Sequence, residues 1–236
     1  MGTMSSATLE MVKVVARGLG SLRERVVFLG GAATSLLITD PALPHIRITF
    51  DVDVIVEVLS RIEYYRLEDS LRELGFTQSI DSDHPVCRWS FHDVIVDVMP
   101  TDAEILGFSN RWYSQAIQHS VTVKLDDDLE IRSVTAPFFL ATKIDAFFGR
   151  GGGDFLSSHD IEDIISLFNG RKELIAEVTR SSPELRAFLS ATFKAFLANE
   201  PFLESIPGHL LPDPANQARY RIVLDQINQI ANMSDT

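Results

Sequence analysis

The chain has 236 residues, of which 45% are hydrophobic, and a formal net charge of −12. This length allows one large domain or two small ones, with enough apolar residues for a core. The acidity argues against binding along extended duplex DNA, because proteins that neutralise a run of phosphates carry a basic stripe. We expect a cytoplasmic protein with no membrane-spanning segment and no internal disulfide, because the apolar runs are short and Cys87 is the only cysteine.

The first half of the chain mixes helical and strand patterns. Hydrophobic periodicity and turn residues predict a helix over 7–20, a strand over 26–29, a short helix over 32–38, a strand over 47–56, a helix over 61–74 and hairpins over 87–99 and 121–134.

From residue 134 onward only helical patterns remain. They predict helices over 137–148, 160–168, 183–198 and 215–231, with a glycine-rich loop at 149–153. We therefore predict an α/β (α+β) fold, a mixed sheet flanked by helices. The expected domains are an α/β domain at residues 1–133 and an α-helical domain at 134–236.

Three aspartates stand inside apolar strand patterns. Asp51 and Asp53 lie two residues apart, so a strand points both carboxylates to one face, about 6–7 Å apart. Asp97 lies in the strand 94–99, where an ionised carboxylate is seldom buried without a partner. If the two strands are neighbours, the three carboxylates meet on one face and form a site for Mg²⁺ or Mn²⁺. The alternative for each aspartate alone is a solvated strand edge or an ion pair with an arginine.

Gly30 and Gly31 lie between a buried strand and a helix. Glycine lets the backbone approach a ligand, and free amides at a helix start attract phosphate oxygens. Thr34 could add a hydroxyl contact, and Arg47, on the face of Asp51, could reach a phosphate. The plainer interpretations are a tight turn for the glycines and a structural ion pair for Arg47.

The order strand, Gly-Gly, helix, Asp-x-Asp strand and later strand aspartate resembles the DNA polymerase β-type nucleotidyltransferase superfamily. The runs 137–143 and 159–164, separated by the glycine-rich loop, look like the AbiEii/AbiGii-type nucleotidyltransferase-like toxin family. That family carries a lysine on a helix, followed by an Asp-x-x-Asp helix. The likeness covers roughly residues 25–170. The chain departs from the superfamily pattern in two ways. The spacing between Gly31 and Asp51 is longer, and Gly-Gly stands where Gly-Ser is typical.

By this resemblance, the chain is expected to move an NMP from an NTP such as ATP to an acceptor hydroxyl, on a tRNA end or a protein. Pyrophosphate would be released, and a toxin role with an antitoxin partner is implied. The implied site comprises catalytic and metal-binding Asp51, Asp53 and Asp97, and nucleotide-binding Gly30, Gly31, Thr34, Arg47, Lys143 and Asp163. In this scheme Lys143 neutralises a phosphate, and Asp163 holds that lysine or the acceptor.

Other classes of protein stay open. One is a non-catalytic nucleotide-binding or regulatory protein that kept the fold. Another is a structural or partner-binding protein, such as one half of a toxin–antitoxin pair. The doublet His159–Asp160 is also typical of a class of metal phosphohydrolases. That chemistry needs a further histidine upstream and a distant aspartate, all on helices. Nothing in the residues chooses the acceptor or the base.

Overall fold

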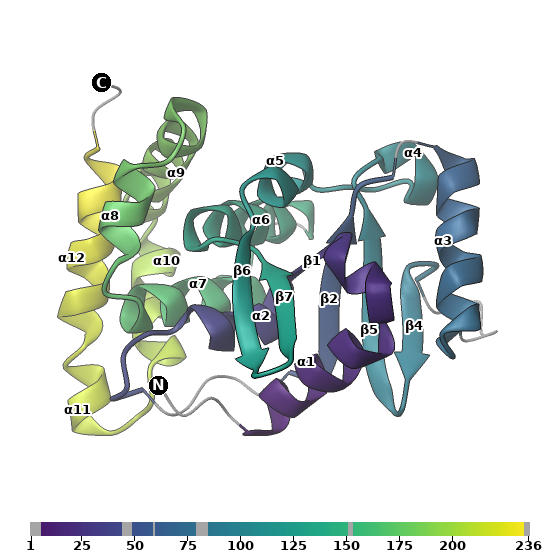
Figure 1. Ribbon diagram of the computed structural model, residues 1–236. Helices are drawn as coiled ribbons and strands as arrows, with labels where there is room; N and C mark the ends of the chain where they lie inside the picture. Colours follow the sequence, from purple (N-terminus) through teal and green to yellow (C-terminus); the bar gives the residue numbers. More distant parts are fainter. Residues whose placement is uncertain (1–5, 44–48, 59, 79–84, 151–152, 234–236) are drawn as a thin grey trace. The chain divides into compact units, whose positions relative to one another are not determined.

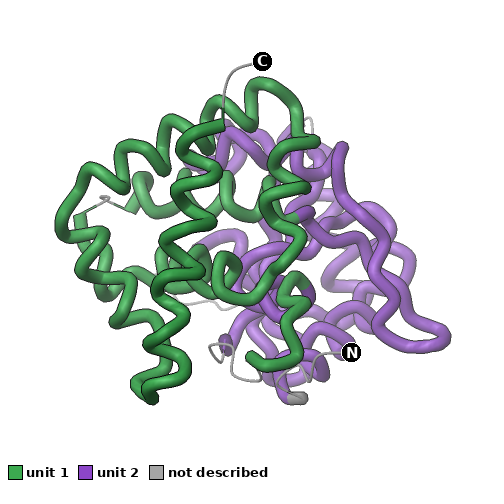
Figure 2. Tube along the Cα trace, turned by 90° about the vertical axis from the view of Figure 1, so that its left-hand side faces the viewer, with its two compact units in different colours: residues 1–2, 37–43, 136–236 green, residues 3–36, 44–135 purple. Residues whose placement is uncertain are grey.

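The computed structural model describes residues 6–43, 49–58, 60–78, 85–150 and 153–233, which form two compact units (Figures 1 and 2). The sheet unit, purple in Figure 2, comes from residues 3–36 and 44–135. The helical unit, green in Figure 2, comes mainly from residues 37–43 and 136–236. The expected domain boundary at 133/134 stays a prediction. The two compact units divide near this boundary, but residues 37–43 belong to the helical unit.

The described strands of the sheet unit form one seven-stranded mixed sheet in the order β3-β4-β5-β2-β1-β7-β6. The pairs β2–β5 and β1–β7 are parallel, and the other neighbours are antiparallel. The strands are β1 (Val26–Leu29), β2 (Asp51–Val56), β3 (Thr77–Gln78), β4 (Arg88–Phe91), β5 (Val94–Pro100), β6 (Val121–Asp126) and β7 (Leu129–Ser133). The predicted class, a mixed sheet flanked by helices, is confirmed.

One face of this sheet is covered by α1 and α3, which lie beside it in Figure 1. Alternation sends Val52 and Val54 of β2 into this core, together with Val96 and Val98 of β5. The aspartates between these valines therefore project from the opposite face. The helices of the unit are α1 (Ser6–Gly18), the 3₁₀ helix η1 (Gly20–Glu24), α2 (Gly30–Leu37), α3 (Arg61–Glu73), α4 (Ala103–Leu106) and α5 (Tyr113–Gln118).

The helical unit buries aromatic side chains between its helices. Phe168 and Phe193 meet edge to face at 5.0 Å, and Phe196 contacts Phe202 at 4.9 Å between ring centroids. Its helices are α6 (Ala136–Gly149), α7 (His159–Gly170), α8 (Leu174–Thr179), α9 (Pro183–Leu197), α10 (Glu200–Ser205), the 3₁₀ helix η2 (Ile206–His209), α11 (Pro214–Gln217) and α12 (Tyr220–Ala231). Among the helices the structure describes, none combines the length and apolar character that crossing a lipid bilayer requires.

Several elements differ from the sequence prediction. The helix expected over 32–38 begins at Gly30, and the described part of the strand expected over 47–56 begins at Asp51. The single helix expected over 215–231 is wrong, because the chain forms α11 and α12 with a break before Tyr220. At this break the Arg219 guanidinium donates hydrogen bonds to Asn169 and Asp40. This is a tertiary contact that no local pattern contains.

Asp40 links residues 37–43 to the rest of the helical unit. Its side chain is 8% exposed, accepts the Ala42 N–H at 3.1 Å and pairs with Arg219 at 2.9 Å. The Ala42 amide first, and then Arg219, hold the pKa of Asp40 below its ordinary value of 3.8. A lowered folded pKa means that this stabilisation is present above the unfolded value and lost as the pH falls through the folded one.

Asp40→Asn should therefore change the pH dependence of stability at the acid end. We expect the difference in unfolding free energy between the wild type and Asp40→Asn to be constant above about pH 5. It should shrink below about pH 4, because Asp40 is then protonated first in the unfolded chain and, at lower pH, in the folded one. Urea unfolding followed by far-UV circular dichroism at several pH values measures this difference. A difference that is the same at pH 3 and pH 6 would contradict the assigned role.

Candidate functional site

The parallel pairing of β2 with β5 brings two of the three strand aspartates side by side. Asp53 lies directly opposite Asp97 in the register, and Asp51 lies opposite Ile95. In-register residues of neighbouring strands share a face and are about 4.8 Å apart, and Asp51 joins them because the side-chain period is two. Asp97 is buried, whereas Asp51 and Asp53 are half-buried. The three carboxylates therefore occupy one face of the sheet, opposite the core formed with α1 and α3.

Gly30 closes one side of this group of carboxylates. Leu29, the last residue of β1, pairs with Asp53, and the chain then turns into α2 at Gly30 with φ +70°. A Cβ on Gly30 would lie 1.7 Å from Oδ2 of Asp53, so only glycine leaves room for this carboxylate. The positive end of the α2 dipole favours an anion at this position. The close approach that the sequence pattern predicted is therefore made by Asp53, and a phosphate contact stays a prediction.

The residues around Gly30 and Asp51 differ in how exposed they are. Thr34 is 0% exposed, so its hydroxyl does not reach the surface, and among the described residues it has no hydrogen-bond partner. The Thr49 hydroxyl donates to Oδ1 of Asp51 at 2.5 Å. Phe50, between Thr49 and Asp51, is 77% exposed. Arg47 lies outside the described residues.

Asp97 has a partner that the sequence analysis did not identify. Nε of Arg88 donates to Oδ1 of Asp97 at 2.9 Å, and Nη2 donates to Oδ2 at 2.7 Å. Such two-pronged pairs are stronger and more directional than single hydrogen bonds. The signal was present in the sequence, because a two-residue turn at His92–Asp93 pairs residue 88 with residue 97 by counting outward, and the structure has this register.

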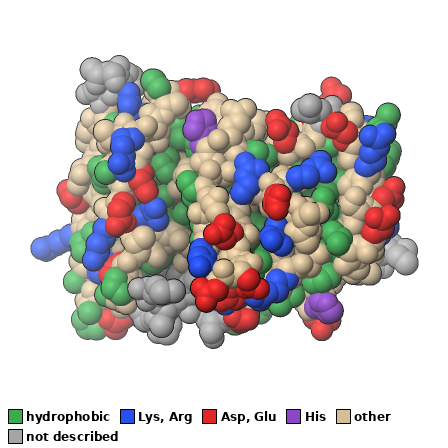
Figure 3. Space-filling view, in the orientation of Figure 1, with side chains coloured by type: hydrophobic (Ala, Val, Ile, Leu, Met, Phe, Trp, Pro, Cys, Tyr) green, Lys and Arg blue, Asp and Glu red, His purple; other side chains and the backbone are tan. Residues whose placement is uncertain are grey.

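The charges on this face are unbalanced. Three carboxylates share the face with the Arg88 guanidinium, whose pKa is raised above its ordinary value by the hydrogen bond to Asp97 and, more weakly, by the charge of Asp51. Neighbouring Cys87 is buried, which raises the pKa of its thiol to about 11. Figure 3 shows the molecule from the side of α1, opposite the carboxylates, and there acidic and basic side chains are interspersed.

Carboxylate oxygens are the ligands that Mg²⁺ and Mn²⁺ prefer. Asp51 and Asp53 fit this requirement as donors, being on one face and half-buried. Asp97 fits less well, because Arg88 donates to both of its oxygens and leaves only their remaining lone pairs. Within the described ranges, no group of three or more His, Cys, Asp or Glu side chains is placed to hold a metal ion. As they stand, the residues therefore fit a two-carboxylate site.

A buried ion network lies in the helical unit. Nζ of Lys143 on α6 is 2.6 Å from Oδ2 of Asp163 and 3.3 Å from Oδ1 of Asp160, both on α7. Arg150 also pairs with Asp160. Asp160 is thus a buried member of the network and more than a charge at the start of α7. His159, its neighbour in the doublet, is exposed and lies 3.2 Å from Glu162 instead. The expected roles of Lys143 and Asp163 toward a nucleotide stay predictions.

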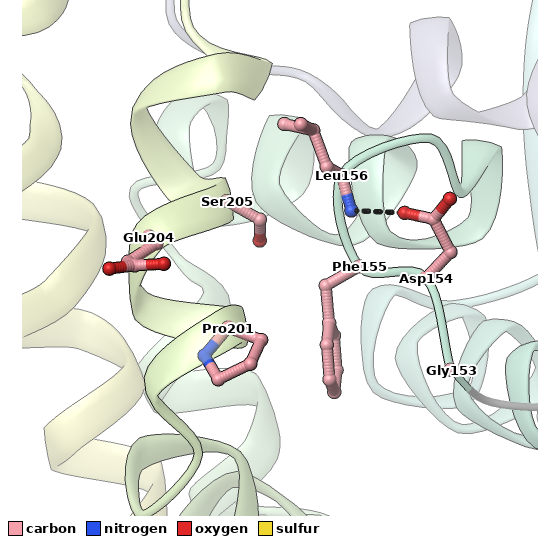
Figure 4. A pocket seen from close by; sticks show the side chains of 7 residues that line it. All are labelled: Gly153, Asp154, Phe155, Leu156, Pro201, Glu204 and Ser205. Carbon is pink, nitrogen blue, oxygen red and sulfur yellow. Dashed lines mark hydrogen bonds between the residues drawn. The ribbon is translucent and has the colours of Figure 1, made fainter.

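A cavity of about 280 Å³ in the helical unit is a second candidate. Figure 4 shows the Phe155 ring beside Pro201, and the Asp154 carboxylate turned toward the N–H of Leu156. Asp154 also accepts the N–H and hydroxyl of Ser157, so it caps its own loop. The polar groups of this cavity do not converge on a common point. The carboxylate face of β2 and β5 is the stronger candidate.

Similarity to known proteins is found among solved structures. No protein-family model matches the chain, and no curated protein is significantly similar to it. A similar solved structure is that of an antigenic nucleotidyltransferase-like protein from Paracoccidioides brasiliensis. The two have 23% sequence identity and a TM-score of 0.47, over 87% of this chain and 94% of that chain.

Proposed function

We propose that the sheet unit is the catalytic part of a cytoplasmic nucleotidyltransferase. It would move an NMP from an NTP, such as ATP, to an acceptor hydroxyl and release pyrophosphate. The observation that supports this most is the register of β2 and β5, which sets Asp53 beside Asp97 with Asp51 on the same face. Carboxylates that converge in this way suit the binding of divalent cations and, through them, of phosphates.

Each group on this face has a separate task in the proposal. Asp51 and Asp53 would hold Mg²⁺ or Mn²⁺, which, when bound, neutralises negative charge on the transferred phosphate. The backbone N–H groups at the start of α2, at Gly30 and Gly31, would bind phosphate oxygens. Asp97, held by Arg88, would orient the acceptor hydroxyl. The acceptor that we propose is a tRNA end or a protein hydroxyl, in a toxin-like role with an antitoxin partner.

A label-transfer assay tests this function. The full chain is incubated with each α-³²P-labelled NTP, Mg²⁺ and either total RNA or total protein. We expect label on RNA or protein that requires Mg²⁺ and disappears in Asp53→Asn. The matched control is Asp93→Asn, the same chemical change at an exposed turn residue with a left-handed backbone that Asn tolerates. Transfer by no NTP to either acceptor, or equal transfer by Asp53→Asn, would overturn the proposal.

One observation favours a second candidate, a non-catalytic nucleotide-binding protein that kept the fold. Arg88 engages both oxygens of Asp97, as expected if the third carboxylate had become structural. This candidate predicts that an NTP raises the melting temperature with no label transfer, because a ligand that binds only the folded state stabilises it. Transfer that is lost in Asp53→Asn would exclude it.

A further inference from the structure

Arg88 pairs with Asp97, the residue expected to be the third metal ligand. It lies on β4, directly opposite Asp97 on β5, so the two side chains leave the same face of the sheet. Their contact is two-pronged, at 2.9 and 2.7 Å. The Asp97 side chain is 13% exposed, whereas the Arg88 side chain is 31% exposed. The carboxylate is therefore held inside the sheet face, and the guanidinium lies nearer to solvent.

We infer that Arg88 is a built-in cation that competes with a divalent metal ion for Asp97, an inference that rests on the proposed function. While Arg88 holds Asp97, metal binding by the three carboxylates falls to Asp51 and Asp53. This agrees with the absence, among the described residues, of a three-carboxylate cluster placed for a metal ion. Recruitment of Asp97 by the metal requires the guanidinium to leave, and its partial exposure gives it solvent to move into.

Electrostatics gives this competition a definite sign. A divalent ion between Asp53 and Asp97 would lie within a few ångströms of the guanidinium, and like charges at such a distance repel strongly in a partly buried site. Arg88 also interacts electrostatically with Asp51, so its charge opposes a metal ion on either side of Asp53. The competing explanation is that Arg88 merely orients Asp97, leaving the unused lone pairs of the carboxylate for the metal. If Arg88 orients Asp97, it strengthens metal binding. If Arg88 competes with the metal ion for Asp97, it weakens metal binding.

Mn²⁺ binding to the full chain separates the two explanations. Free Mn²⁺ is measured by its electron paramagnetic resonance signal during titration of wild type, Arg88→Gln and Arg88→Lys. We expect Arg88→Gln to bind Mn²⁺ at least about tenfold more tightly than the wild type, because the repulsion is removed. Arg88→Lys keeps the charge and should stay close to the wild type. Adding Asp97→Asn to Arg88→Gln should remove the gain.

Two controls keep the test interpretable. Arg66→Gln changes the net charge equally at an exposed position of α3, and should leave the Mn²⁺ affinity unchanged. Trp89, the buried neighbour of Arg88, reports by its fluorescence whether each variant is folded. If Arg88→Gln is not folded, Arg88→Met replaces it, because it removes the same charge and keeps the apolar stem, and the same gain in Mn²⁺ affinity is expected.

Each further outcome has a separate meaning. If folded Arg88→Gln binds Mn²⁺ as tightly as the wild type or more weakly, the inference that Arg88 competes with the metal ion is overturned. If the wild type also transfers label in the assay above, the proposed function stands and this inference alone fails. Absence of Mn²⁺ binding in the wild type and in every variant overturns both this inference and the metal site of the proposed function.

Discussion

Replacing Gly30 by alanine is expected to destabilise the sheet unit by about 2–5 kcal/mol. Two costs add in this variant. The backbone at φ +70° is unfavourable for a residue with a Cβ, at about 1–2 kcal/mol. The new Cβ would also lie 1.7 Å from Oδ2 of Asp53, and the displacement that relieves such an overlap costs about 1–3 kcal/mol. Urea unfolding followed by tryptophan fluorescence measures the loss, because the two tryptophans, Trp89 and Trp112, both lie in the sheet unit.

Gly107 provides a matched control for the backbone cost. It also has a positive φ, +79°, but a Cβ there would meet nothing within 4 Å. Gly107→Ala should therefore lose only the backbone part, about 1–2 kcal/mol. The double variant Gly30→Ala/Asp53→Gly removes the overlapping carboxylate, and should be more stable than the sum of the two single changes predicts. Equal losses for Gly30→Ala and Gly107→Ala would show that the contact with Asp53 is not what requires glycine.

Much of the sheet unit could be predicted because its patterns are local. Valines alternate with the aspartates of β2 and β5, and that alternation alone predicts which side chains leave the core. The parallel pairing that sets Asp53 beside Asp97 is different. The two strands are separated by α3, β3 and β4, and no local pattern states that they are neighbours. The meeting of the three carboxylates was therefore predicted only on the condition that the two strands are neighbours. The fold meets this condition.

The partners of the candidate residues were harder to predict than their positions. Close approach of a group to Gly30 follows from its residue type, but the fold decides that this group is the Asp53 carboxylate. Thr34 follows the glycines as a phosphate-binding hydroxyl would, yet burial hides it. Arg88 is the reverse case. Counting outward from the hairpin turn identifies it, from the sequence alone, as the neighbour of Asp97. An aspartate in an apolar strand should therefore be checked first against its hairpin partner.

The helical unit shows the same limit. The spacing of Asp160 and Asp163 places both on one face of a helix, as a local pattern predicts. Their pairing with Lys143 joins α6 to α7 across a loop, and periodicity does not encode it. Arg219 likewise interrupts a helical pattern through contacts with Asn169 and Asp40. Long-range ion pairs are thus the features of this chain that sequence reasoning finds last.

Lys143→Met is expected to destabilise the helical unit by about 3–5 kcal/mol, as when one partner of a buried ion pair is removed. The Lys143 side chain is 12% exposed, and those of Asp160 and Asp163 are 3% and 2% exposed. Methionine keeps the apolar stem but leaves two buried carboxylates without this cation, and Arg150 still pairs with Asp160. Urea unfolding followed by far-UV circular dichroism measures the loss. Lys194→Met, at an exposed lysine of α9, is the matched control and should change stability by less than about 0.5 kcal/mol.

A second variant distinguishes the loss of a charge partner from the loss of packing. Replacing both partners of a buried ion pair by apolar residues is often neutral, whereas removing one leaves a buried charge. Lys143→Met/Asp163→Leu should therefore recover at least half of the stability lost in Lys143→Met. The double variant would recover nothing if Lys143 acted mainly through its contact with the Phe139 ring, at 5.8 Å from the centroid. Recovery would mean that the charge of Lys143 is balanced within the helical unit, so that phosphate binding by this lysine requires Asp163 or Asp160 to release it.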